Sequence, residues 1–200
     1  VDKLGLPSTL GYSSVGQVLE VGQEVSSISV GDTVACGGSG HAEIVAVPKN
    51  LCCKIDEGVN LKEAAFTTIG AIAMQGLRQA NTKLGEVVAV IGLGLIGQIT
   101  MELLRASGCK AIGIDIDKSK VIFSKKIGKT AYSRNDSHLF EKIDAITKSR
   151  GVDSVIIAAS TPSEDPIKLA SEIIRQKGTI TVVGAVTLKF ERKHFYEKEL

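Results

Sequence analysis

The sequence predicts an α/β protein in which a small β-rich domain precedes a doubly wound parallel sheet. Three observations indicate this class. A glycine-rich loop lies between a strand pattern and a helix pattern, strands and helices alternate after it, and short strand patterns precede it. The 200 residues, 44% of them hydrophobic, can build one large domain or two small ones with a sizeable core. We expect a β domain at residues 1–65 and an α/β domain at residues 66–200.

The first 65 residues carry short β-rich runs that are separated by turn residues. The run at 15–21 comes first, the run at 28–30 is followed by Gly31-Asp32, and the run at 44–47 ends at Pro48. Runs of Val and Ile that are bounded by Gly, Asp and Pro are typical of short strands. We therefore expect three short strands in a small, glycine-rich β domain.

From Ala64 onward the apolar pattern becomes helical and then alternates between strands and helices. Asp117 is the predicted N-cap of one helix, and Asp165-Pro166 opens another, since proline is favoured at the first helical position. The expected elements are, in chain order, a helix at 64–77, a strand at 87–91, a helix from the glycine loop to Gly108 with Ile96, Ile99, Leu103 and Leu104 on its apolar face, a strand at 111–114, a helix from Asp117 to Gly128, a helix from Ser137 to near Gly151, a strand at 155–158, a helix from Asp165 to Gly178 and a strand at 180–184.

The glycine-rich loop has the sequence Gly-Leu-Gly-Leu-Ile-Gly at residues 92–97, directly after the apolar run 87–91. In a βαβ unit that binds a dinucleotide, Gly92 would make the tight turn, Gly94 would let the backbone approach a pyrophosphate, and Gly97 would let helix and strand pack closely. The helix N-terminus would hold the phosphates through backbone N–H groups and its dipole. The predicted cofactor contacts of this loop are Gly92, Gly94, Leu95, Ile96 and Gly97.

Asp115 adds a second part of the dinucleotide pattern. It follows the apolar run 111–114 and lies 18 residues beyond Gly97, close to the roughly 20-residue spacing expected of the acid that binds the adenosine ribose. A carboxylate there would repel a 2′-phosphate, so we expect NAD, with NADP less favoured. The alternative is that Asp115 only helps to start the next helix, although Asp117 is the better N-cap candidate.

Composition excludes several classes of function. A net charge of +2 without a basic stripe, with only 4% aromatic residues, argues against nucleic-acid binding. No apolar stretch reaches the roughly 18 residues of a membrane span, and no signal peptide is evident, so we expect no membrane association and a cytoplasmic location. The four cysteines are expected to be reduced thiols, and the neighbours Cys52 and Cys53 would face opposite sides of a strand.

Several segments in the same order make the chain similar to the medium-chain dehydrogenase/reductase family, the relatives of zinc-type alcohol dehydrogenases. The segments that carry the resemblance are 16–22, 30–34, 41–43, Pro48, 63–65, 92–97 and 178–184. The resemblance implies a partial GroES-like substrate domain followed by a Rossmann dinucleotide-binding domain. It also implies an NAD(P)-dependent oxidoreductase that acts on a small molecule and can pair as a homodimer.

The resemblance implies further cofactor contacts. Lys120 matches a basic residue that often reaches the adenosine ribose. The alternative is that Lys120 is a solvated surface residue without a role in binding, as most surface lysines are. The remaining implied contacts lie in the loops after two strands of the cofactor domain and comprise Ala159, Ser160, Val183, Gly184 and Ala185.

The chain departs from the zinc enzymes of this family at their metal ligands. Where those enzymes usually have Gly-His-Glu, this chain has Gly11 followed by Tyr12-Ser13, and Ile69 occupies the segment where they commonly place a cysteine. The lobe for structural zinc would need four cysteines, and only Cys36 is present there. Cys36 and His41 do not complete a tetrahedral site. We therefore expect no zinc and no other metal, with a buried Cys36 thiol and a partly exposed His41.

No catalytic residue is singled out by the sequence. Tyr12 and Ser13 are candidates by position only. His138 and His194 lie in or near predicted helices without apparent cysteine or carboxylate partners, so we expect them to be surface residues.

Tyr12-Ser13 and the segment 195–200 are similar to a zinc-free branch of the family associated with polysaccharide biosynthesis. The family pattern also implies a longer parent protein, with more of the β domain before residue 1 and a sixth sheet strand after residue 200. We therefore expect the chain to be a fragment that is inactive alone. The alternative function is a non-catalytic nucleotide-binding module of a larger protein.

Overall fold

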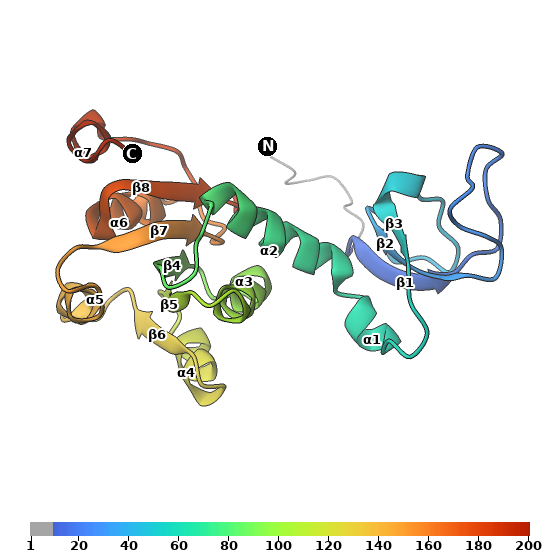
Figure 1. Cartoon of the computed structure of the whole chain (residues 1–200), viewed down its shortest axis with the longest axis horizontal. Coiled ribbons are helices and arrows are strands. Elements are labelled where there is room, and N and C mark those ends of the chain that lie inside the picture. The colour runs from blue at the N-terminus through green and yellow to red at the C-terminus, as the bar shows by residue number, and fades with distance from the viewer. Residues whose placement is uncertain (1–9) are drawn as a thin grey trace. The chain divides into compact units, whose positions relative to one another are not determined.

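The computed structural model describes residues 10–200, which form two compact units (Figure 1). The first unit ends at Ala71 and the second comprises Ile72–Leu200. We describe each unit by itself below. The predicted fold class, an α/β protein with a β segment before a parallel sheet, is confirmed.

The first unit contains a small antiparallel sheet in the order β1-β2-β3. Ile28, Val34 and Cys36 form its buried cluster, and partly buried valines pack around them. The Oγ atom of Ser13 donates to the carbonyl of Ala65 at 2.5 Å, which ties the start of β1 to the turn after the first short helix. The elements of this unit are β1 (Ser13–Gln17), β2 (Thr33–Gly37), the 3-10 helix η1 (Lys49–Leu51), β3 (Cys52–Lys54), α1 (Leu61–Ala64) and the start of α2 (Thr67–Ala80).

Of the three predicted strands in this unit, the one at 15–21 overlaps β1 only at residues 15–17, and the other two are wrong. Residues 28–30 form no strand, because the chain turns at residues 29–32, where the Asp32 carboxylate accepts a hydrogen bond from the N–H of Ser29 at 2.9 Å. Residues 44–47 form no strand, and Ile44 is 71% exposed. β-branched composition favours a strand only where a partner strand is at hand. Here β2 and β3, which carry weaker strand patterns, pair with each other instead.

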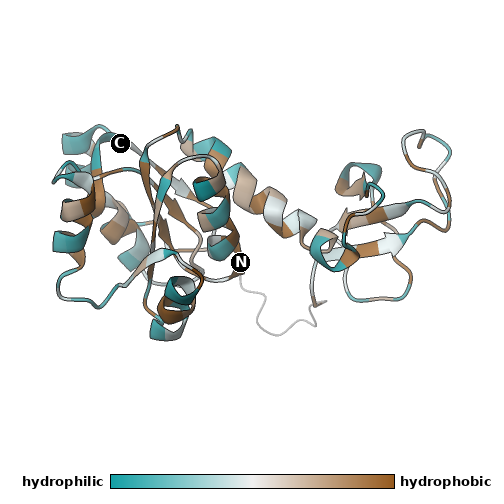
Figure 2. Cartoon of the chain, turned by 60° about the horizontal axis from the view of Figure 1, so that its bottom comes forward, coloured by the Kyte–Doolittle hydropathy of each residue, from teal (hydrophilic) through white to brown (hydrophobic). Residues whose placement is uncertain are grey.

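The second unit is built on a parallel five-stranded sheet in the order β6-β5-β4-β7-β8. Every residue of β4 and β7 is buried, as expected for parallel strands that are covered on both faces. Figure 2 shows the hydrophobic residues along these strands. The strands are β4 (Val87–Ile91), β5 (Lys110–Asp115), β6 (Thr130–Ser133), β7 (Val152–Ile157) and β8 (Ile174–Val182).

Helices cover both faces of this sheet (Figure 1). One apolar cluster joins the sheet to α3, α4 and the end of α2, through residues such as Leu77, Met101 and Val121. A second cluster joins the opposite face to α5 and α6 through residues such as Leu139 and Ile167. The helices are α3 (Leu95–Ala106), α4 (Lys118–Lys126), α5 (Leu139–Thr147), α6 (Asp165–Ile173) and α7 (Arg192–Lys198).

The apolar face of α3 differs from the predicted one. The buried residues are Gly97, Thr100, Met101 and Leu104, while Ile96, Ile99 and Leu103 are only partly buried. The small residues Gly97 and Thr100 bring the helix backbone close to the sheet, which turns the helix away from the predicted face. The Thr100 hydroxyl donates to the carbonyl of Ile96 at 2.9 Å, so its burial leaves no unsatisfied polar atom.

The helix predicted from Asp165 to Gly178 ends earlier, at Ile173, and β8 begins at Ile174. Ile174 pairs with Val152 of β7, and an irregularity in the register follows. Arg175 accounts for the extended backbone, because its Nε donates to the buried carboxylate of Asp153 at 2.8 Å. This ion pair joins β8 to β7, a contact that local helix propensity does not anticipate.

Candidate functional site

The strand order of the second unit reverses at β4, so the carboxyl end of this strand is the expected position of a ligand-binding crevice. The chain proceeds from β4 through β5 to β6 on one side and then returns to β7 on the other side of β4. In open α/β sheets, ligands bind where the strand order reverses in this way. The loops after β4 and β7 therefore border the candidate site.

The three glycines of the loop after β4 meet three different surroundings. Gly92 has a φ of +98°, and an added Cβ would lie 2.6 Å from the backbone N of Ala159. An added Cβ on Gly97 would lie 1.9 Å from the carbonyl oxygen of Gly92. At Gly94, by contrast, an added Cβ would have no atom within 4 Å. Gly92 and Gly97 are thus required by packing, whereas Gly94 faces open space.

The N-terminus of α3 is open to an anion. Gly94 is its N-cap, without a side chain to cap the helix, and the first turn contains no acidic residue. The first N–H groups of a helix lack intrahelical acceptors, and the helix dipole makes this end electropositive. Leu95, in the first turn, is 53% exposed, and Ile96 is partly buried. This helix end can hold a phosphate group.

Asp115 lies at the end of β5, where the spacing predicted it, and its side chain is only 7% exposed. Its Oδ2 accepts a hydrogen bond from the N–H of Leu93 at 2.6 Å, and its Oδ1 accepts one from the N–H of Asp117 at 2.8 Å. A carboxylate can accept about four hydrogen bonds. Asp115 therefore holds the glycine-rich loop and retains acceptor capacity for hydroxyl groups of a ligand.

Lys120 lies beside this carboxylate, with its Nζ 4.0 Å from Asp115 Oδ2 and 3.9 Å from Asp117 Oδ2. Its side chain is 46% exposed. Asp117 caps α4 as predicted, and hydrogen bonds from the hydroxyl and the N–H of Ser119 lower the pKa of its carboxyl group. The exposed ammonium group of Lys120 can therefore move to a ligand without breaking a short ion pair.

The loops after β7 and β8 pack against each other by backbone. The N–H groups of Val183 and Gly184 both donate to the carbonyl of Ile157, at 2.9 and 3.0 Å. An added Cβ on Gly184 would lie 2.0 Å from the carbonyl oxygen of Ala159. Gly184 is thus also required by packing. Ala159 and Val183 are partly buried, whereas Ser160 and Ala185 are exposed at this edge.

Two features of the site were not predicted from the sequence. The N–H of Leu93 is the group that connects the loop to Asp115. Arg134, directly after β6, donates its backbone N–H to the carbonyl of Asp115 at 2.9 Å and forms a two-pronged ion pair with Asp165. The hydrogen bond with Asp165 raises the pKa of the Arg134 guanidinium. The available signal was the position of Arg134 at the carboxyl end of a strand.

The residues considered as metal ligands do not gather in the first unit. Among residues 10–200, no group of three or more His, Cys, Asp or Glu side chains could hold a metal ion. Cys36 is buried, and its Sγ lies 3.7 Å from that of Cys52. His41 is exposed, its ring lying beside Gly11, and Tyr12 is 44% exposed. The donor set present in the described chain does not suit zinc.

His138 and His194 do have carboxylate partners, contrary to expectation. His138 Nδ1 lies 2.9 Å from Glu141 Oε2, and His194 Nε2 lies 3.4 Å from Glu191 Oε2. Each pair is spaced three residues apart, which brings the side chains together on one helical turn. The His138 side chain is 63% exposed and that of His194 33% exposed, so these are pairs at or near the surface.

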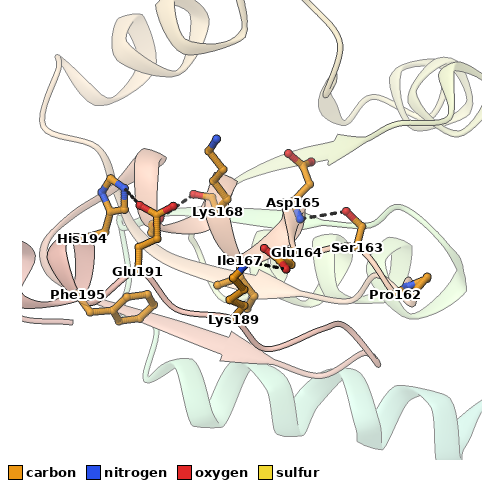
Figure 3. A pocket seen from close by; sticks show the side chains of 11 residues that line it. Pro162, Ser163, Glu164, Asp165, Ile167, Lys168, Lys189, Glu191, His194 and Phe195 are labelled. Atoms are coloured by element: carbon orange, nitrogen blue, oxygen red, sulfur yellow. Dashed lines mark hydrogen bonds and ion pairs between the residues drawn. The ribbon is translucent and has the colours of Figure 1, made fainter.

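A cavity of about 460 Å³ lies between α6, α7 and the segment before α7 (Figure 3). Polar pairs border it, with Lys189 Nζ 3.1 Å from Glu164 Oε1 and His194 Nε2 3.4 Å from Glu191 Oε2 at its other side. None of the residues that line it belongs to the glycine-rich loop or to the predicted cofactor contacts. We therefore place the candidate site at the loop and not at this cavity.

Among the described residues, no helix combines the length and apolar character needed to cross a membrane.

Comparisons with known proteins agree with this architecture. Residues 96–200 match the family described as zinc-binding dehydrogenase, and residues 2–57 match the alcohol dehydrogenase GroES-like domain. D-xylulose reductase A of Aspergillus oryzae is 28% identical over 214 residues, which cover 89% of this chain and 59% of that protein. D-guloside 3-dehydrogenase of Escherichia coli is 30% identical over 180 residues, which cover 88% of this chain and 51% of that protein.

A solved structure has the same fold. An alcohol dehydrogenase from a Thermus species aligns with a TM-score of 0.84 and 24% identity over 98% of this chain and 68% of its own. The chain spans 51% and 59% of the length of the two sequence relatives, so it corresponds to about half of each. The predicted family is confirmed by the two domain matches together. The chain belongs to the medium-chain dehydrogenase/reductase family, among the relatives of alcohol dehydrogenase.

Proposed function

We propose that this chain supplies the cofactor domain and part of the substrate domain of an oxidoreductase that uses NAD. The enzyme would transfer hydride between the nicotinamide ring and a carbonyl or alcohol group of a small molecule, without zinc. Residues 66–200 would bind the cofactor, and residues 1–65 would contribute to the substrate side. The observation that carries the proposal is the open face of Gly94 at the uncapped N-terminus of α3.

The pyrophosphate of the cofactor fits this helix end. The open space at Gly94 is the space that a Cβ would fill, so a phosphate oxygen can approach the backbone there. Neighbouring N–H groups of the first helical turn, at Leu95, Ile96 and Gly97, would donate to the phosphates. Gly92 has no such open space beside it, because it lets the loop pass close to the backbone of Ala159.

Asp115 and Lys120 would bind the adenosine ribose. The Asp115 carboxylate already accepts hydrogen bonds from two backbone N–H groups, and these bonds hold it in a fixed orientation. A carboxylate oriented in this way accepts hydrogen bonds from the ribose hydroxyls and repels the extra phosphate of NADP. The carboxylate therefore favours NAD. It also holds the glycine-rich loop through the N–H of Leu93, so the residue that would select the cofactor also positions the loop.

The nicotinamide ring would lie along the loops after β7 and β8. Ala159, Ser160, Val183, Gly184 and Ala185 supply the backbone groups for this end, and close packing of Gly184 on Ala159 fixes the two loops together. The bound cofactor supplies the hydride donor or acceptor. Two relatives are named as a D-xylulose reductase and a D-guloside 3-dehydrogenase, which favours polyhydroxylated compounds as the first substrates to test.

Binding of NADH and NADPH to the wild type and to two glycine variants tests the proposal. The added methyl of Gly94→Ala should weaken NADH binding about tenfold, which is about 1.4 kcal/mol, without changing stability. Gly16→Ala is the matched control, because its added Cβ also meets no atom within 4 Å. Unchanged NADH affinity in Gly94→Ala would contradict the assignment of the loop.

Cofactor choice is tested by Asp115→Asn, which preserves an oxygen for the N–H of Leu93 and removes the charge. The wild type should prefer NADH, and this variant should narrow the difference by strengthening NADPH binding. Equal affinities in the wild type would refute the assignment of NAD.

Turnover of the full-length protein, tested with aldehydes, ketones, quinones and polyols, addresses the reaction itself. Cofactor binding without turnover of any of them would favour the alternative, a non-catalytic nucleotide-binding module. Stoichiometric zinc in the purified protein would contradict the zinc-free mechanism.

We also propose that the protein acts in the cytoplasm and pairs as a homodimer. Cys36, Cys52, Cys53 and Cys109 are free thiols, which suits a reducing compartment. Sedimentation of the full-length protein tests the dimer, and a monomer at micromolar concentration would refute it.

A further inference from the structure

Cys36 and Cys52 lie directly opposite each other on the neighbouring antiparallel strands β2 and β3. Their Sγ atoms are 3.7 Å apart. Both side chains belong to the apolar cluster of the first unit, where Cys36 is buried and Cys52 is partly buried. Cys53 is the next residue and is exposed. Cys52 and Cys53 are neighbours in the sequence, but the pair that the fold brings together is Cys36 with Cys52.

The ladder geometry suits a covalent link at this pair. The N–H of Ile55 donates to the carbonyl of Thr33 at 2.9 Å, which makes residues 33 and 55 a hydrogen-bonded pair. Such pairs alternate along an antiparallel ladder, so Cys36 and Cys52 form a non-hydrogen-bonded pair. In these pairs the Cα atoms are about 4.5 Å apart and the side chains are close. Disulfides need Cα separations of about 4.4–6.8 Å.

The two thiols differ in reactivity. Burial, together with the hydrogen bond to Cys52, raises the pKa of the Cys36 thiol to about 11. Cys36 is therefore protonated at neutral pH. Cys52 is less buried than Cys36, so it is the thiol of this pair that an oxidant reaches first.

We propose that Cys36 and Cys52 form a reversible cross-strand disulfide when the protein meets a hydroperoxide. This inference does not depend on the proposed function, because it concerns only the first unit. In the first step, the Cys52 thiolate attacks the outer oxygen of the hydroperoxide. The O–O bond breaks, the alkoxide takes a proton from water, and Cys52 becomes a sulfenic acid.

In the second step, Cys36 attacks the Sγ of Cys52. The S–S bond forms, the S–O bond breaks, and the thiol proton of Cys36 leaves with the hydroxyl group as water. Together the two thiols lose two electrons and two protons to the hydroperoxide, which becomes one alcohol and one water molecule. A dithiol reductant reverses the link by thiol–disulfide exchange.

The link would close the chain from residue 36 to residue 52. This segment contains η1 and His41, and its conformational freedom would fall on oxidation. Oxidation would thus stiffen the loop that joins β2 to β3. The redox state of this pair would therefore control the flexibility of the loop in the first unit.

Peptide mapping after mild hydroperoxide treatment of the full chain tests the proposal. We expect a linked pair of peptides that contain Cys36 and Cys52, the loss of two of the four free thiols, and recovery of all four with dithiothreitol. Cys53→Ser is the matched control and should form the same link. Cys36→Ser should form no link and should retain an oxidised Cys52 that a sulfenic-acid reagent labels.

Three results would overturn the proposal. They are a link between Cys52 and Cys53, a link through Cys53 between two molecules, and a sulfinic acid at Cys52 with Cys36 still free. The mapping of the wild type decides the question even if Cys36→Ser fails to fold.

Discussion

The two units of the molecule are stabilised in different ways. In the second unit every residue of β4 and β7 is buried, and helices cover both faces of the sheet. In the first unit the buried cluster comprises Ile28, Val34 and Cys36, with partly buried neighbours. A parallel sheet between two helix layers requires continuous apolar strands, whereas a small antiparallel sheet tolerates mixed ones. The second unit should therefore be the more stable and the more sensitive to substitution.

Charged groups show the same difference. The second unit buries Asp115, Lys129 and Asp153, and each of them has hydrogen-bond partners. Lys129 Nζ donates to the carbonyl of Gln98, which ties β6 to the helix that carries the candidate phosphate site. In the first unit the ion pair between Lys54 and Asp32 is at the surface, with Lys54 58% exposed. Ion pairs at the surface contribute little to stability.

The largest effect is expected for Asp153→Ala. The carboxylate accepts from the N–H of Val87 at 2.8 Å and from Arg150 and Arg175. Removing one partner of a buried ion pair costs about 3 kcal/mol or more, because the remaining groups lose their compensation. Hydrogen exchange should show the loss in the amides of the second unit, with those of the first unit unchanged. Equal loss in both units would contradict two separately stabilised units.

The same residue gives a pH dependence. Burial by itself raises the pKa of the Asp153 carboxyl, but the N–H of Val87 and the charges of Arg175 and Arg150 outweigh it, and the pKa lies below its ordinary value of 3.8. A lowered folded-state pKa stabilises the protein above pH 3.8, and this stabilisation is lost as the pH falls through the lower folded value. Asp153→Asn should remove this part of the acid sensitivity of the second unit.

The next effect is that of Gly97→Ala, compared with Gly16→Ala. An added Cβ at Gly97 would lie 1.9 Å from the carbonyl oxygen of Gly92, whereas at Gly16 it would meet no atom within 4 Å. Overpacking against backbone should cost about 3 kcal/mol at Gly97. Gly16→Ala should change stability by less than about 0.5 kcal/mol. Urea unfolding followed by circular dichroism measures both, and a tolerated Gly97→Ala would show that α3 can move away from the sheet.

The second unit is also the one whose structure follows more directly from local sequence. The continuous apolar run 87–91 is β4, Asp117 caps α4, and the predicted glycine loop lies at the switch in strand order. Each of these signals is contained in a few neighbouring residues. In the first unit, residues 28–30 and 44–47 have strand composition but no partner strand. Strand pairing depends on distant residues, which composition does not reveal.

A long-range contact also explains one of the errors in the second unit. The end of α6 at Ile173 depends on the ion pair between Arg175 and Asp153. At the candidate site, the position of Asp115 was predictable from spacing, but its hydrogen bond to the N–H of Leu93 was not. Such a contact requires the loop and the strand end to be placed in space. The role of Asp115 in cofactor choice stays a prediction.

A smaller difference is expected between Val90→Ala and Val34→Ala. Val90 is fully buried in the central strand β4, and Val34 is 5% exposed in β2. Removing two methyl groups from a rigid core that is packed on both sides should cost about 2.5 kcal/mol, because the cavity cannot collapse. The thinner core around Val34 can relax, so a cost of about 1 kcal/mol is expected there. Thermal unfolding of both variants checks the order, and equal costs would show that the first unit is packed as rigidly as the second.

The smallest effect is expected at the helix caps. The Asn60 side chain accepts from the N–H of Lys62 at 2.9 Å and caps α1, so Asn60→Ala should cost about 1 kcal/mol in the first unit. Asp117 caps α4 by the same kind of contact with Ser119, which lowers the pKa of its carboxyl group. The Asp117 cap should therefore weaken as the pH falls through that lowered pKa, while the Asn60 cap has no charge to lose. Hydrogen exchange at acidic pH should show α4 fraying and α1 unchanged, because only one of the two caps titrates.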